Sequence, residues 1–291
     1  MFRIIAIVLT MSQFLFGLTN YYVDNTVNTS GDGTFEQPFK SIAEGMAKLQ
    51  AGDTLFVRGS LSEPAQIYQE NLYLGDSAPS GTAQARIVVK AYQNELVRIV
   101  LESSFSIYAS YWTFENLIFD MDGKNYDTIK LKGDFVTFRS CEITNGQKDG
   151  FDINGASGTL IENCKIHNFV RNDQYDAHGI ILNGGVDNII RNNVIFDCKG
   201  DCIQLYKSDQ NYGTLIEGND LYTTLGSNSE NAIDVKAARN LRIINNKMHG
   251  FHDSEDSDGV ALKINKDSDD ILIYGNDILK ATVAFELAAA M

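Results

Sequence analysis

Acidic side chains recur along the middle of the chain and form two clusters. The clusters comprise Asp127, Asp149 and Asp152 in the first and Asp201, Glu230 and Asp234 in the second. Adjacent carboxylates repel one another unless a cation lies between them, and oxygen-rich clusters suit Ca²⁺. The pattern therefore predicts a calcium site. The alternative is structural, because Asp before Gly is a common turn residue and acidic edge positions discourage aggregation.

Candidate bases lie close to these carboxylates. Lys236 and Lys263 follow the second cluster, whereas Lys132 lies farther from it. We expect a Lys beside other cations on a half-buried sheet to have a lowered pKa, so that a neutral amine is available for proton transfer. His178 is a third candidate, although a single His at a loop end is more often a hydrogen-bonded turn residue.

Cationic, aromatic and amide side chains near the clusters are predicted to bind an anionic ligand. They are Lys130, Arg171, Tyr175, Gln204, Tyr206 and Arg239. The cations would hold anionic groups of the ligand. The tyrosines would stack on its rings or donate a proton.

A repeat is predicted to position these residues. The segment 149–153 is a short apolar strand, and 159–166 supplies a turn and two further strands. The same order returns at 178–182 and 188–195. One copy cannot bury its apolar face, but stacked copies can, so the repeat predicts a single-stranded right-handed parallel β-helix, an all-β solenoid.

Strand alternation separates an inward from an outward face. The inward residues of the first strand of each coil are all apolar, from Ile129 and Leu131 to Val260 and Leu262. Two outward columns are then expected: Lys130, Asp152, Ile181, Gln204, Asp234, Ala261; and Lys132, Asn154, Asn183, Tyr206, Lys236, Lys263. A third column precedes the strands: Asp127, Asp149, His178, Asp201, Asn231, Asp258.

An asparagine ladder is predicted at the turn after the second strand. That position is occupied in successive coils by Leu117, Cys141, Cys164, Asn193, Asn219, Asn246 and Asn276. Stacked amides can donate to and accept from their neighbours one strand spacing away. The two cysteines are expected to be stacked, buried thiols. Cys198 and Cys202 would close a small loop only in an oxidising compartment.

Composition limits the function. A chain of 291 residues with a formal net charge of −14 does not resemble a nucleic-acid binder. It is compatible with an anionic polymer if calcium bridges the like charges. Residues 1–18 are predicted to be a signal peptide, with Arg3 before an apolar run, so we expect a secreted or periplasmic protein without a membrane span.

The domain is predicted to span residues 19–291, with regular coils from about residue 86. A helix over 38–49 would cap the open N-terminal end, and an irregular region would extend to Thr82. Residues 288–291 follow the last predicted strand without a cap. That end would expose a strand edge, so self-association or truncation is expected there.

The N-terminal motifs resemble those of secreted parallel β-helix polysaccharide lyases, most nearly pectate lyases of family nine. The motifs are Tyr21-Tyr22-Val23-Asp24, Gly33-Thr34, Pro38-Phe39-Lys40-Ser41-Ile42, Gly52-Asp53-Thr54 and Val57-Arg58-Gly59. The resemblance implies β-elimination on a uronate polymer, calcium held by Asp residues on the first sheet, and a Lys base there.

Two placements of the family's metal motif remain open. Asp149-Gly150-Phe151-Asp152 with Asp127 matches it, except that Lys148 takes one acidic position. The alternative is 230–234, with Asp201 before it and Lys263 after it. The first placement lacks an outward Lys in the next coil, and the second supplies one.

Three other functions remain as alternatives. Asn172-Asp173 and Asp176-Ala177-His178 resemble parts of secreted mannuronan C5-epimerases, whose reaction shares the removal of the C5 proton. Gly200-Asp201-Cys202-Ile203 is similar to a motif of glycoside hydrolases of this fold. A non-catalytic carbohydrate-binding or adhesin module is the remaining possibility.

Overall fold

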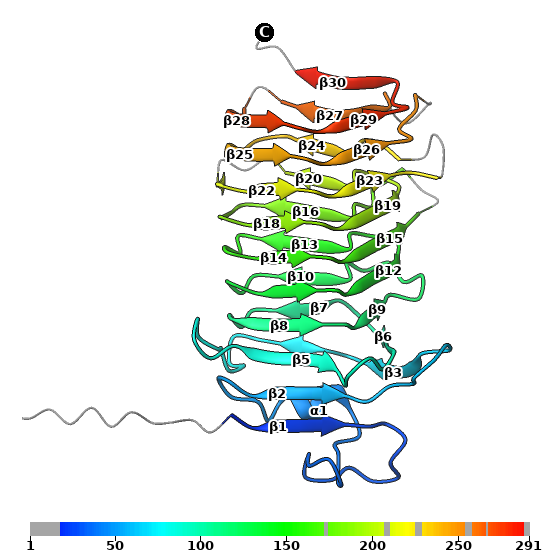
Figure 1. The fold of residues 1–291 in the computed structure, drawn as a ribbon, viewed down its shortest axis with the longest axis vertical. Coiled ribbons are helices and arrows are strands. Elements are labelled where there is room, and N and C mark those ends of the chain that lie inside the picture. The colour runs from blue at the N-terminus through cyan, green and yellow to red at the C-terminus, as the bar shows by residue number, and fades with distance from the viewer. Residues whose placement is uncertain are drawn as a thin grey trace, which may run out of the picture.

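The protein is a right-handed parallel β-helix, as the repeat predicts (Figure 1). The computed structural model describes residues 18–171, 174–206, 210–224, 229–253, 258–265 and 267–287. Residues 1–17 of the predicted signal peptide, Asn172-Asp173 of the epimerase-like motif and Ala288–Met291 lie outside the described residues. Within the described part, no helix is long and apolar enough to span a membrane.

Three parallel sheets wind around one core, and each coil contributes one strand to each sheet. Sheet 1 contains β4 (Tyr73–Leu74), β7 (Phe105–Ile107), β10 (Ile129–Leu131), β13 (Phe151–Asn154), β16 (Ile180–Asn183), β20 (Ile203–Leu205), β24 (Ile233–Val235), β27 (Val260–Ile264) and β30 (Val283–Leu287).

Sheet 2 follows sheet 1 in each coil. It contains β1 (Asn20–Val23), β2 (Thr54–Val57), β5 (Ile87–Ala91), β8 (Trp112–Glu115), β11 (Thr137–Arg139), β14 (Leu160–Glu162), β18 (Ile189–Arg191), β22 (Leu215–Glu217), β25 (Arg239–Ile244) and β28 (Asp269–Tyr274). The short strands β17 (Gly185–Val186) and β21 (Asn211–Tyr212) join it through β25.

Sheet 3 completes each coil. It contains β3 (Gln66–Glu70), β6 (Val97–Leu101), β9 (Ile118–Asp120), β12 (Glu142–Gly146), β15 (Lys165–Phe169), β19 (Val194–Cys198), β23 (Asp220–Tyr222), β26 (Lys247–His249) and β29 (Asp277–Leu279).

The alternation of inward and outward side chains in sheet 1 is confirmed. Ile129, Phe151, Ile180 and Ile203 occupy one register position in successive strands, and all four are fully buried. Apolar side chains at one position therefore stack along the axis, and the coils share a continuous core.

The asparagine ladder is also confirmed at the corner between sheets 2 and 3. The Nδ2 atoms of Asn193, Asn219 and Asn246 each donate to the Oδ1 atom of the next Asn, at 3.0, 2.9 and 3.0 Å. The same Oδ1 atoms accept backbone N–H groups, for example from Asn219 to Asn246 at 3.0 Å. The ladder therefore satisfies polar backbone groups that the turn would otherwise bury without partners.

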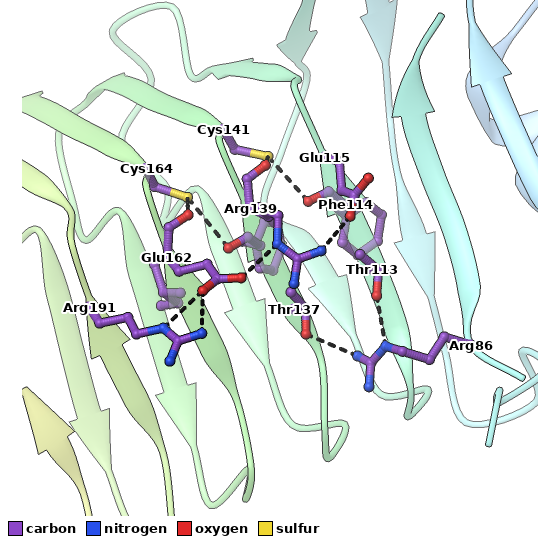
Figure 2. Close-up of polar contacts among 12 residues, drawn as sticks. Arg86, Thr113, Phe114, Glu115, Thr137, Arg139, Cys141, Glu162, Cys164 and Arg191 are labelled. Carbon is purple, nitrogen blue, oxygen red and sulfur yellow. Dashed lines mark hydrogen bonds and ion pairs between the residues drawn. The ribbon is translucent and has the colours of Figure 1, made fainter. Parts of the chain in front are cut away.

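A charge ladder runs along the outward face of sheet 2 (Figure 2). Arg139 Nη1 lies 2.7 Å from Glu115 and its Nε 2.6 Å from Glu162, while Arg191 Nη2 lies 2.6 Å from the same Glu162. Strand pairing extends the column to Lys90 before Glu115 and Glu217 after Arg191. Opposite charges therefore alternate through six consecutive coils, which is favourable for cross-strand neighbours.

The predicted N-terminal boundaries were wrong. The helix α1 spans only Ile42–Met46, with the Ser41 side chain accepting from the N–H of Glu44. Ile42 and Met46 are buried beside β1 and β2 at the N-terminal end of the stack (Figure 1), but a capping role stays a prediction. The predicted irregular region contains β3 and β4, so the coils begin before residue 86.

The predicted register of β27 was wrong by two residues. Asp234 pairs with Lys263 rather than with Ala261, so Lys263 is not opposite Lys236 and Asp258 lies outside the column before the strands. A slip of two residues keeps every side chain on its predicted face, so alternation cannot detect it. In β30, Phe285 and Leu287 are exposed, and self-association at this end stays a prediction.

The four cysteines are buried free thiols. Cys141 and Cys164 donate to the carbonyl oxygens of Phe114 and Phe138 at 3.4 and 3.5 Å, as expected for stacked positions (Figure 2). Burial and the neighbouring Cys164 thiol raise the pKa of Cys141. These thiols therefore act as small core side chains.

We predict that Asn219→Ala lowers the free energy of unfolding by about 2 kcal/mol, because it leaves buried partners unsatisfied. Asn276→Ala, at the partly exposed end of the ladder, should cost clearly less because water can replace the lost contacts. Urea denaturation measures both variants. Equal losses of unfolding free energy in the two variants would contradict the expectation that the interior amides of the ladder contribute more than the terminal one.

Candidate functional site

A row of polar residues lies at the corner between sheets 3 and 1, where each sheet 1 strand begins. It comprises Asp127, Asp149, His178, Asp201 and Asn231, each two residues before its strand. The backbone holds these positions in register, because Gly150 N donates to His178 O at 2.9 Å and Gly179 N to Asp201 O at 3.0 Å. A Cβ at Gly179 would lie 2.6 Å from the carbonyl oxygen of Cys202, so this close stacking requires glycine.

His178 joins the two predicted acidic clusters into one row. Its Nδ1 lies 2.8 Å from Asp149 Oδ1, which also accepts the His178 backbone N–H at 2.8 Å. On the other side, Nε2 lies 3.1 Å from Gln204 Nε2 and 3.8 Å from Asp201 Oδ2. Gln204 Nε2 donates to Asp201 Oδ2 at 2.7 Å, and Asn231 donates to Asp201 Oδ1 at 2.7 Å.

Both ring nitrogens of His178 are therefore occupied. Burial alone would lower its pKa, but Asp149, Asp201 and Asp176 raise the pKa to about 9. The amide nitrogen of Gln204 facing Nε2 fits a neutral ring protonated at Nδ1, and a protonated ring needs the amide turned so that Oε1 faces Nε2. In either state both ring nitrogens contact side chains of the protein, which fits a positioning role, and a catalytic role of His178 stays a prediction.

Two members of the second acidic cluster, Asp201 and Asp234, are buried and paired within the chain, and Glu230 is half-buried. Asp201 is fully buried, and burial raises its pKa despite the charge of His178. Asp234 forms an ion pair with Lys236, and its Oδ1 accepts from Asn265 at 3.1 Å. Burial alone would lower the pKa of Lys236, but its contact with Asp234 raises the pKa instead, contrary to the lowered value expected of a base.

Two carboxyl groups titrate near neutral pH. Burial, followed by the charges of Asp127 and Asp149, raises the pKa of Asp152 to about 6. Burial, followed by the charges of Asp201 and Asp176, raises the pKa of Glu230 to about 7. Pairs of groups with perturbed pKa values are typical of active sites.

A pocket of about 470 Å³ opens beside the first half of the row. Its lining residues are Asp127, Lys148, Asp149, Arg171, Tyr175, Asp176 and His178. The Arg171 guanidinium lies 5.1 Å from the centroid of the Tyr175 ring, which is 60% exposed. Lys130 contributes from β10 by holding Asp127 at 3.0 Å. The pocket thus combines cations and an aromatic ring with paired carboxylates.

The remaining predicted residues lie away from this pocket. Lys263 lies on β27, three strands beyond β16, with its Nζ 3.7 Å from Asp258 and 3.5 Å from Glu286. Tyr206 is exposed at the end of β20. Arg239 starts β25 of sheet 2, so it does not share the outward face of sheet 1. Gln204 is buried and contacts His178 and Asp201 of the polar row, and its predicted role in substrate binding stays a prediction.

Sequence reasoning missed the roles of Lys148 and Asp176 in the pocket. Lys148 counted only as an interruption of an acidic motif, and Asp176 only as part of a loop motif. Both lie at the end of a sheet 3 to sheet 1 connection, Lys148 directly before Asp149 and Asp176 two residues before His178. Proximity in sequence to Asp149 and His178 was the available signal.

The carboxylates of the row do not form a ready calcium site. In the described ranges, no group of three or more Asp, Glu, His or Cys side chains is arranged to hold a metal ion. Asp127 and Asp149 are contacted by Lys130 and His178. Calcium binding stays a prediction of the sequence.

Comparisons with known proteins identify relatives of the fold. A family model described as "Pel9A-like, right handed beta helix region" matches residues 21–211, and a general right-handed β-helix model matches 178–288. No curated protein matches the sequence significantly.

Solved structures with this fold include enzymes of different chemistry. Pectate lyase Pel9A has a TM-score of 0.68 at 17% identity, over 94% of this chain and 78% of that one. Lacto-N-biosidase from Eubacterium ramulus has a TM-score of 0.62 at 16% identity, over 90% of this chain and 56% of that one. Alginate lyase from Paenibacillus sp. str. FPU-7 has a TM-score of 0.60 at 13% identity, over 93% of this chain and 99% of that one. At these identities the likeness shows a shared fold.

We predict that Asp152→Asn stabilises the protein at pH 7.5. The folded-state pKa is raised from 3.8 to about 6. Ionisation of the carboxyl group therefore lowers the free energy of unfolding as the pH rises through this range. The gain should be about 1–2 kcal/mol, reduced from the full shift because the side chain is partly exposed. Urea denaturation should show a smaller gain at pH 4.5. Asp76→Asn, at an exposed position, serves as the control.

Proposed function

Because the chain belongs to the Pel9A-like right-handed β-helix family, we propose that it is a polysaccharide lyase acting on an acidic, uronate-containing polysaccharide. The observation that carries the proposal is the pocket in which Lys148, Arg171 and Tyr175 meet the Asp127–Asp149–His178 row. Pectate and alginate lyases with the same fold support this substrate class.

The pocket offers the groups that bind an acidic sugar. The planar guanidinium of Arg171 matches a carboxylate with two parallel hydrogen bonds, and Lys148 adds a second positive charge. The exposed Tyr175 ring offers an apolar face to the sugar ring and a hydroxyl at its edge. Cations at the carboxylate would stabilise the charge that develops when the neighbouring C5 proton is removed.

Asp152 is the base in the proposed reaction; it does not line the pocket itself but lies at an outward position of β13, opposite Lys130 and three residues after the pocket residue Asp149. Its pKa of about 6 lets an ionised carboxylate coexist with appreciable basicity near neutral pH. Removal of the C5 proton by Asp152 and breakage of the C4–O4 bond would form a C4=C5 double bond. Tyr175 would supply the proton that the departing oxygen needs. Lys130 and His178 contact Asp127 and Asp149, and a calcium requirement is left to the chelator assay below.

The polar row supports the proposal as a rigid frame. Lys130 and His178 hold Asp127 and Asp149 beside the pocket, while Gln204 and Asn231 hold Asp201 behind it. Buried hydrogen-bonded groups of this kind fix the orientation of the groups that touch substrate. Export of the protein from the cytoplasm would bring it to such polymers, and remains part of this proposal.

The test is an assay on a panel of pectate, alginate and neutral polymers, followed by ultraviolet absorbance of the unsaturated product. We expect Arg171→Ala to lower kcat/KM by about a hundredfold, equivalent to roughly 3 kcal/mol. Arg242→Ala, at an exposed position on sheet 2, is the matched control. Parallel assays with a chelator test the calcium expectation separately. Altered C5 stereochemistry without cleavage would indicate an epimerase, and polymer binding without reaction would indicate a binding module.

The pH profile identifies the base. With Asp152 as base, kcat/KM should rise with pH through about 6 and level off above it, because only the ionised carboxylate accepts a proton. Glu230 as base would move this limb to about 7. Asp152→Asn should abolish turnover. If this variant stays active and its kcat/KM rises with pH as in the wild type, Asp152 is not the base.

A further inference from the structure

We propose that Tyr73, Tyr108 and Lys132 form a second binding site for the acidic polymer, a sugar subsite outside the pocket. These residues lie on the outward face of sheet 1, toward its N-terminal end. The inference rests on the proposed function for the choice of ligand, and its geometry is independent of the catalytic groups.

The three side chains form a continuous platform. Tyr73 lies on β4 and is 65% exposed, and Tyr108 follows β7, the strand that pairs with β4. The two ring centroids are 6.1 Å apart at an angle of 59°. A Cβ at Gly75 would lie 2.6 Å from the Tyr73 ring, so glycine at this position makes room for the ring.

Lys132 adds a positive charge to the platform. It follows β10, in which Leu131 pairs with Ile107, so Lys132 lies opposite Tyr108. Its Nζ lies 5.1 Å from the centroid of the Tyr108 ring, a cation–π distance. Among the described residues, Lys132 forms no ion pair with a carboxylate, whereas its neighbour Lys130 is paired with Asp127 at 3.0 Å.

The platform fits an acidic sugar. A sugar ring has an apolar C–H face that can lie on a tyrosine ring, and a uronate carboxylate can pair with the ammonium of Lys132. On a chain with a net charge of −14, a cation without a carboxylate partner, beside the half-buried Tyr108 ring and the exposed Tyr73 ring, is complementary to an anionic ligand. A neutral sugar would use the rings but leave the charge without a partner.

The platform and the pocket lie toward opposite ends of the sheet 1 strands, because Asp127 and Asp149 stand two residues before their strands, whereas Tyr108 and Lys132 directly follow β7 and β10. Strands β7 and β4 precede β13, the strand of Asp152, by two and three positions in sheet 1. At about 4.8 Å per strand, the two tyrosines lie about 10–14 Å from Asp152 along the solenoid axis, and at about 3.3 Å per residue Lys132 lies up to about 16 Å from Asp127 along the coil. A polymer that crosses the outward face of sheet 1 would reach both the platform and the pocket, whereas a disaccharide bound in the pocket would not. The platform therefore favours longer chains.

Affinity electrophoresis in gels containing polygalacturonate tests the platform. The Asp152→Asn background keeps the polymer intact. We expect Tyr108→Ala and Lys132→Gln each to raise the Kd for the polymer about five- to tenfold, with little effect on a disaccharide. Tyr274→Ala, whose wild-type side chain is 70% exposed on sheet 2, is the matched control. Lys132 is exposed, so its substitution tests binding without disturbing the core.

The outcomes separate the platform from the proposed reaction. An unchanged polymer Kd in both folded variants would overturn the platform, even if the parent protein cleaves the polymer. Weaker retention of the variants would support it, even if the parent protein shows no cleavage, in which case the proposed reaction alone would fail. An equal increase in the Kd for the disaccharide would also contradict the platform, because it would place the effect of the substitutions in the pocket.

Discussion

In-register stacking of parallel strands is the constraint on which the structure depends. Every side chain in a middle coil has a counterpart about 4.8 Å away in the coils before and after it. A polar side chain is therefore stable only when its counterparts complement it. The molecule meets this condition in three ways. Asparagine pairs with itself at one corner, Arg and Glu alternate on sheet 2, and His178 separates Asp149 from Asp201 at the remaining corner.

The third arrangement differs from the other two because its charges are not balanced throughout. Asp152 and Glu230 retain raised pKa values, and both owe part of the shift to carboxylates of the same row. At the asparagine corner, by contrast, the buried polar positions carry neutral amides, as at Asn193 and Asn219. Carboxyl groups with raised pKa values next to further carboxylates are a feature that active sites often share.

Much of the fold could be predicted from the sequence because periodic burial repeats in every coil. The asparagine ladder and the inward faces of sheet 1 followed from this periodicity. The register of β27 did not, because a slip of two residues leaves the alternation unchanged. The contact between Gln204 Nε2 and His178 Nε2 also could not be predicted, since it depends on hydrogen-bond directions between coils. Arg239 is close in sequence to Lys236, which follows a strand of sheet 1. A turn of only a few residues leads from sheet 1 to sheet 2, so Arg239 lies on sheet 2 and does not share the outward face of sheet 1.

The alternating Arg–Glu column of sheet 2 also limits how this solenoid can grow (Figure 2). Duplication of a single coil within this column would set two glutamates or two arginines side by side, whereas duplication of two adjacent coils would preserve the alternation. The asparagine corner sets no such parity, because an amide complements any number of copies of itself. Lengthening by even numbers of coils is therefore favoured between β5 and β22, at a modest cost per violation since these pairs are partly exposed.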